Sequence, residues 1–190
     1  RIVEDLDSAF YNTEMIVPNT GIVHDRIAVQ VFKGCTRGCR FCQAGMTDRP
    51  VRERSAASVA DQVEKLLKNT GWEEVGLLSL ATCDWSGMGK ILKRFEPMLK
   101  KNQIKLSLPS LRVDAFSVNM AAELETIRKG GLTFAPEAGT QRLRNVINKG
   151  VTDSDIESAL EATFSHGWDR VKLYFMMGLP SEREEDLAGI

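Results

Sequence analysis

Short apolar runs that alternate with amphipathic helical segments constrain the fold of this chain more than any other feature. Each run is bounded by turn residues, as expected for a buried strand. Between the runs, residues 56–67 and 88–99 place their apolar side chains on one helical face. Parallel strands joined by helices of this length form either a (β/α) barrel or an open doubly wound sheet. The predicted strands cover residues 27–32, 75–80, 104–108, 132–135 and 171–177.

Three further helices follow from spacing and capping signals. Residues 117–129 carry an apolar stripe. Thr152, followed three residues later by Asp155, predicts a capping box at the start of the next helix. Ser181 and Glu184 repeat this spacing and predict a similar cap for the last helix.

Composition indicates one domain without an overall charge bias. The 190 residues are 43% hydrophobic, and 25 basic and 26 acidic residues give a formal charge of −1, so no net field favours nucleic acid or an anionic membrane. A local basic patch could still bind nucleic acid. No apolar run approaches the roughly 20 residues of a membrane span, and no secretion signal is evident, so we expect a cytoplasmic protein without membrane association.

The chain divides into a lead-in and a core. Residues 1–25 have no sustained period and predict a lead-in segment, whereas residues 26–190 form the predicted core. Because the chain begins without Met and ends within a predicted helix, we expect it to be part of a longer protein.

Three cysteines lie directly after the first predicted strand. Cys35, Cys39 and Cys42 follow the spacing C-x3-C-x2-C in a strand-to-helix loop, where parallel α/β folds place their sites. Clustered thiolates favour iron–sulfur or zinc over harder metals. Three ligands for a four-iron cluster leave one iron open, which suits catalysis better than electron storage.

Two other interpretations of these cysteines remain open. A zinc site usually includes histidine or a fourth cysteine, and the two histidines, His24 and His166, are distant in the sequence. Cys39 and Cys42 alone could form a redox dithiol, although Cys35 makes this less suitable.

The motif, with Phe41 before its third cysteine, resembles that of the radical S-adenosylmethionine (SAM) superfamily. Residues 34–46 and 49–54 further resemble uncharacterised bacterial members with a cobalamin-binding domain ahead of the core. The resemblance implies a partial (β/α)6 TIM-like barrel, truncated here before its sixth strand. It also implies a [4Fe–4S] cluster on the three cysteines, which cleaves SAM reductively to a 5′-deoxyadenosyl radical. An external electron donor of the flavodoxin or ferredoxin type is implied, and cobalamin could serve the full-length protein.

The same resemblance suggests cofactor contacts at other strand ends. It assigns Phe41 beside the cluster and Glu137 after the fourth strand to cofactor binding. It also assigns two further groups, although the residues after the second strand depart from the family's usual Gly-Gly-Glu stretch. These two groups are Ser79, Leu80 and Ala81 after the second strand, and Met176 and Gly178 after the fifth.

Two residues near these strand ends are ambiguous. Arg112 could clamp a carboxylate or phosphate of the cofactor, or form an ordinary ion pair with Asp114. Cys83 fits a packed thiol better than an extra cluster ligand or hydrogen-atom donor.

We therefore expect a radical SAM enzyme acting on an unknown substrate. A methyl or methylthio transferase for RNA or ribosomal protein is the alternative enzyme. A non-catalytic iron–sulfur or zinc binding module is the alternative from another class, and a fourth cysteine ligand would have favoured it.

Overall fold

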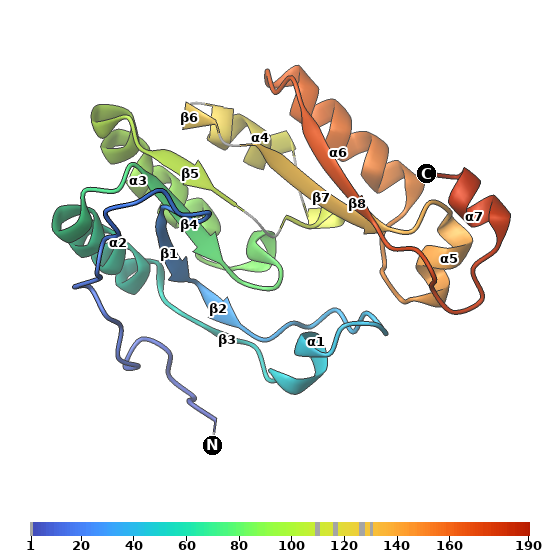
Figure 1. Cartoon of the computed structure of the whole chain (residues 1–190), viewed down its shortest axis with the longest axis horizontal. Helices are drawn as coiled ribbons and strands as arrows, with labels where there is room; N and C mark the ends of the chain where they lie inside the picture. The colour runs from blue at the N-terminus through green and yellow to red at the C-terminus, as the bar shows by residue number, and fades with distance from the viewer. Residues whose placement is uncertain (1, 109–110, 116–117, 126–127, 130) are drawn as a thin grey trace.

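The computed structural model describes residues 2–108, 111–115, 118–125, 128–129 and 131–190. Its larger sheet has four parallel strands in the order β1, β4, β5 and β6 (Figure 1). A second sheet pairs β7 with β8, also in parallel, and a bridge between Leu111 and Phe134 connects β7 to the segment after β5. The strands are β1 (Ile27–Gln30), β4 (Glu74–Leu78), β5 (Lys105–Ser107), β6 (Arg128–Lys129), β7 (Leu132–Glu137) and β8 (Val171–Phe175).

The parallel α/β architecture predicted from the sequence is confirmed, with a partial barrel that does not close among the described residues. The first predicted strand is shorter than expected, because the chain leaves the sheet after β1. It then forms a small antiparallel ladder between β2 (Phe32–Lys33) and β3 (Arg52–Glu53). This ladder joins the two ends of the cysteine loop.

The prediction that the fifth strand is buried was wrong. Its central side chains are exposed, and Tyr174 is 59% accessible. In the described part of the chain, β8 pairs with β7 alone. The apolar run fits a strand that is buried on both faces, but the second covering layer is not supplied by these residues.

Helices connect the strands, and local signals set their ends. The Ser55 hydroxyl caps α2 (Ala56–Thr70) by accepting a hydrogen bond from the backbone of Ser58, and Gly71 ends the helix in a left-handed conformation. The remaining helices are α1 (Ala44–Thr47), α3 (Met88–Asn102), α4 (Val118–Glu125), α5 (Gln141–Val146), α6 (Asp153–Ser165) and α7 (Glu184–Ala188), with short 3-10 helices η1 (Thr82–Asp84) and η2 (Val113–Ala115).

The capping box of Thr152 and Asp155 is confirmed at the start of α6. Two other expectations need correction. The helix predicted over 117–129 is present as α4, but its predicted end was wrong, because residues 128–129 belong to β6. The N-cap residue of α7 is Arg183, whose backbone N–H donates to the carboxylate of Asp186. Ser181 and Glu184 do not form the predicted cap, because Ser181 lies in a turn with positive φ.

One hydrophobic core joins the strands to the covering helices. It combines strand residues such as Val29 and Leu77 with Val63 of α2, Ile91 of α3 and Ala159 of α6. Burying these faces in one core favours the parallel layering. A smaller cluster around Leu143 and Ile147 of the α5 region packs separately.

The predicted lead-in has no helix or strand between residues 2 and 25. It is tied to the core by Tyr11, whose hydroxyl donates to the carbonyl of Ala28, and by Arg54, which donates to the carbonyl of Leu6. Within the described ranges, no helix is long and apolar enough to cross a bilayer. The domain boundary and the cytoplasmic location stay predictions.

Candidate active site

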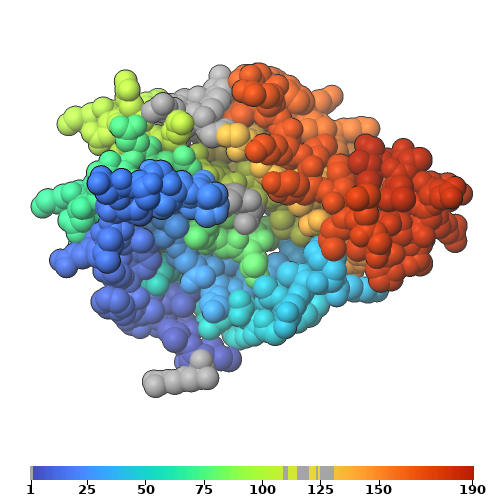
Figure 2. Space-filling model, viewed as in Figure 1, coloured from blue at the N-terminus to red at the C-terminus, as the bar shows by residue number. Residues whose placement is uncertain are grey.

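The loop between β2 and α1 presents the three cysteines beside the carboxyl ends of the strands. It begins at Gly34, whose φ of +92° is poorly tolerated by other residues. A Cβ atom there would lie 2.7 Å from the carbonyl oxygen of Asp48, so the two sides of the loop approach closely. The loop crosses to the C-terminal half of the molecule, which lies beside it in Figure 2.

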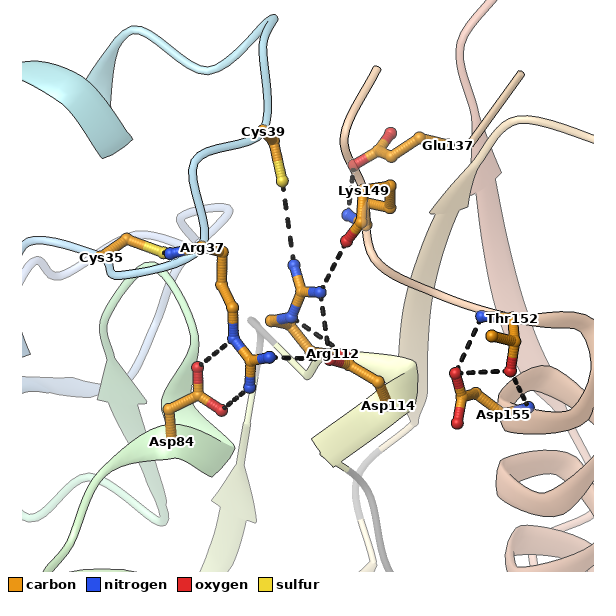
Figure 3. Close-up of polar contacts among 10 residues, drawn as sticks. All are labelled: Cys35, Arg37, Cys39, Asp84, Arg112, Asp114, Glu137, Lys149, Thr152 and Asp155. Atoms are coloured by element: carbon orange, nitrogen blue, oxygen red, sulfur yellow. Dashed lines mark hydrogen bonds and ion pairs between the residues drawn. The ribbon is translucent and has the colours of Figure 1, made fainter. Parts of the chain in front are cut away.

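All three cysteines are free thiols, and each sulfur has a hydrogen-bond donor. Cys35 accepts from the backbone N–H of Arg37 at 3.4 Å, and Cys42 accepts from that of Gly45 at 3.3 Å. Cys39 is the most buried of the three, with 8% of its surface accessible. Its donor is the guanidinium of Arg112, which comes from another part of the chain, at 3.9 Å (Figure 3).

This donor set fits an iron–sulfur cluster. Three sulfur ligands with nearby N–H donors match the groups that hold and tune such clusters. Gly45 adds room, because a Cβ atom there would lie 3.3 Å from Sγ of Cys42. Among the described residues, no three Cys, His, Asp or Glu side chains converge on one metal ion. A cluster does not need this convergence, since each thiolate binds a different iron.

An ionic network connects the cysteine loop to the ends of β4 and β5. Arg37 forms a two-point contact with Asp84, at 2.7 and 3.0 Å, and reaches Asp114 at 3.0 Å (Figure 3). The hydrogen bond and charge of Asp84 raise the pKa of Arg37, so the guanidinium stays protonated. Asp114 also accepts two hydrogen bonds from Arg112. The ion pair that the sequence left as one alternative for Arg112 is therefore present.

A second set of contacts connects the loop to the segment after α5. The backbone N–H of Arg40 donates to the carbonyl of Ile147, and the amide of Asn148 donates to the carbonyl of Gly38. Lys149 is buried, lies 5.9 Å from the centre of the Phe41 ring and pairs with Glu137 at 3.1 Å. The loop is thus held from both halves of the molecule.

Several residues predicted for cofactor binding meet at this place. Glu137 lies at an irregularity in β7 with a φ of +71°, and its carbonyl accepts from the N–H of Met176 at 2.7 Å. Lys149 joins Glu137 to Phe41, and the carbonyl of Lys149 accepts from Arg112. The structure therefore brings Cys39, Phe41, Arg112, Glu137 and Met176 into one connected site.

The other predicted residues make separate, local contacts. Ala81 is buried, Leu80 is exposed, and the Ser79 hydroxyl bonds that of Thr82 at 2.9 Å. Gly178 lies in a turn that is closed by the side chain of Glu182. The cofactor roles of these residues stay predictions.

Cys83 packs at the edge of the main hydrophobic core, with Sγ 3.5 Å from Sδ of Met120. Burial raises the pKa of the Cys83 thiol to about 12, so the side chain stays protonated. This is the packed role that the sequence favoured.

Sequence reasoning missed Lys149, Asn148 and the position of Asp84. The only local signal for the first two was the Asn-Lys-Gly turn, in which Asn148 and Gly150 have positive φ. Asp84 carried no signal at all, because its importance depends on Arg37, which is distant in the sequence.

The sequence of this chain is similar to a known family and to two curated proteins. The model of the radical SAM superfamily matches residues 29–190. An uncharacterized protein of Methanocaldococcus jannaschii is 31% identical over 159 residues, which cover 84% of this chain and 34% of that protein. The ribosomal protein uS12 methylthiotransferase RimO of Desulfotalea psychrophila is 24% identical over 176 residues, covering 87% of this chain and 39% of RimO. The chain thus spans about a third of the length of these curated relatives.

Solved structures share the fold. The radical SAM methyltransferase TsrM of Kitasatospora setae has a TM-score of 0.72 at 18% identity, covering 85% of this chain and 32% of TsrM. The cobalamin-dependent radical SAM enzyme OxsB has a TM-score of 0.67 at 16% identity, covering 85% of this chain and 25% of OxsB. Because the family model matches most of its length, the chain belongs to the radical SAM superfamily, whose members are enzymes that use a [4Fe–4S] cluster and SAM.

Proposed function

We propose that Cys35, Cys39 and Cys42 hold a [4Fe–4S] cluster and that the protein cleaves SAM reductively to act on a substrate near the strand ends. The observation that carries this proposal is the position of three free thiols on one loop, which is held against the segments after β4, β5 and α5. When bound, the cluster supplies the electron that breaks a carbon–sulfur bond of SAM, after accepting it from a flavodoxin or ferredoxin type donor.

The chain's own residues hold and orient the cofactors. Cys35, Cys39 and Cys42 would hold the cluster, and a four-iron cluster held by three thiolates would keep one iron without a protein ligand. Phe41 is 38% accessible and offers an apolar surface beside the loop, while Glu137 and Lys149 provide opposite charges at the end of β7. Paired in this way, the two charges remain compensated in a largely buried place until a cofactor with both an ammonium and a carboxylate competes for them.

We also propose that the full-length protein uses cobalamin. The similarity in fold to TsrM and OxsB supports it, since both are radical SAM enzymes solved with cobalamin. A methylthio or methyl transferase for RNA or ribosomal protein is the second candidate, supported by the similarity in sequence to RimO.

The test compares cysteine variants of the full-length protein. After anaerobic reconstitution with iron and sulfide and reduction with dithionite, we expect 5′-deoxyadenosine to form from SAM. Cys39→Ala should reduce its formation to background and lower the bound iron. Cys83→Ala is the matched control and should keep both, because Cys83 packs against Met120 rather than in the loop.

Two results would contradict the proposal. A protein that binds one zinc ion would indicate a structural site. A protein that binds a cluster and never cleaves SAM would indicate an electron carrier.

A further inference from the structure

Arg112 is a buried guanidinium with a role beyond an ion pair. Only 8% of its surface is accessible, and its donors reach three different groups. Nε and Nη2 contact Asp114 at 2.9 and 3.2 Å, Nη2 also contacts the carbonyl of Lys149 at 2.9 Å, and Nη1 points to Sγ of Cys39 at 3.9 Å (Figure 3). Because the guanidinium of Arg112 is planar, these contacts direct the N–H group of Nη1 toward the sulfur of Cys39.

The position of this guanidinium is set by its surroundings. The neighbouring Leu111 bridges to Phe134 of β7, which fixes the backbone. Asp114 is itself held by Arg37, which also contacts Asp84. Two arginines and two carboxylates therefore compensate one another, and Nη1 of Arg112 remains directed at Cys39.

Cys39 differs from the other two cysteines in what stabilises its sulfur. Cys35 and Cys42 accept hydrogen bonds from backbone N–H groups of nearby residues, which carry no charge. Cys39 is more buried and accepts from a cationic side chain. A buried thiolate needs such compensation, and hydrogen bonds to sulfur are among the factors that set the potential of a cluster.

We propose that Arg112 is a positioning residue that orients Cys39 and raises the reduction potential of the cluster, an inference that rests on the proposed function. Reduction adds one electron to the cluster and its thiolates. The Arg112–Asp114 pair presents its positive end, Nη1 of Arg112, to one sulfur, and this stabilises the more negative, reduced state. Without Arg112 the reduced state loses this stabilisation, and Asp114 would add an uncompensated negative charge, which acts in the same direction.

The test is a redox titration of the reconstituted full-length protein, without SAM, followed by electron paramagnetic resonance. We expect Arg112→Met to lower the equilibrium constant for reduction about tenfold, which is ~59 mV for a one-electron couple. Arg112→Lys keeps the charge but not the fork, and should lower it less. Arg26→Met is the matched control, because its ion pair with Glu74 lies at the amino ends of β1 and β4; it should leave the potential unchanged.

Different results identify which idea fails. If the wild-type protein binds no cluster, the proposed function fails and this inference with it. If the cluster loads and both Arg112 variants keep the wild-type potential, only the inference is overturned. It is likewise overturned if the potential is unchanged while SAM binds tenfold more weakly, since Arg112 would then hold the cofactor. If Arg112→Met does not fold, the reduction potential of Arg112→Lys is the deciding measurement. A potential below that of the wild type supports the inference, and an unchanged potential overturns it.

Discussion

At the scale of single residues, Gly34 allows the two sides of the cysteine loop to approach each other closely. Gly34 has positive φ and faces the carbonyl groups of Asp48 and Pro50, while Arg52 donates to both of these carbonyls. The Arg52 side chain therefore ties together the end of the loop that faces Gly34. A side chain at position 34 would separate its two sides.

Gly34→Ala should lower the free energy of unfolding by about 2 kcal/mol, because a positive φ and a backbone clash each carry a strain cost. Urea denaturation of the two proteins measures the difference. Gly89→Ala in α3 is the control, since a Cβ atom there meets nothing within 4 Å and alanine favours a helix. Equal destabilisation by both substitutions would contradict the argument.

At the scale of elements, α6 has the clearest local signal in the chain. The Thr152 hydroxyl accepts from the N–H of Asp155 at 3.1 Å, and the Asp155 carboxylate accepts from the N–H of Thr152 at 2.8 Å. The Thr152 hydroxyl also donates to the Asp155 carboxylate at 2.7 Å, and this hydrogen bond, together with that from the Thr152 N–H, lowers the pKa of Asp155. The helix then packs Ala159 and Ala162 into the main core.

Thr152→Ala removes one half of the capping box and should destabilise the protein by about 1 kcal/mol. The change appears as a lower midpoint in urea with an unchanged slope. Ser154→Ala, at an exposed position in the same first turn, should have a much smaller effect. A similar loss in both variants would mean that the cap contributes nothing specific.

At the scale of the whole molecule, the last helix is joined to the start of α5 by one carboxylate. Asp186 of α7 is buried and accepts hydrogen bonds from Thr140, which caps α5, and from Arg142 of α5. Close contact is possible because Gly139 has no side chain; a Cβ atom there would lie 2.4 Å from the carbonyl oxygen of Asp186. The hydrogen bonds from Thr140 and Arg142 lower the pKa of Asp186 from 3.8 to about 2.

This lowered pKa predicts a specific dependence of stability on pH. A depressed folded-state pKa stabilises the folded protein above the unfolded value of 3.8, and the contribution disappears as the pH falls toward about 2. The difference in unfolding free energy between wild type and Asp186→Asn should therefore be constant near neutral pH and shrink between about pH 4 and pH 2. Asp169→Asn, at an exposed position, is the control. A difference that does not change with pH would contradict the linkage.

The sequence by itself determined the parallel α/β fold, the place of the cysteine loop and the cap of α6. These features depend on hydrophobic period, on motif spacing and on residues three positions apart, all of which are local. The tertiary structure alone decided that Arg112 faces Cys39, that Lys149 pairs with Glu137 and that Arg37 bonds Asp84. Each of these contacts joins residues from different loops, and their meeting depends on how the strand ends converge. The residues that neighbour each position in the sequence do not predict that convergence.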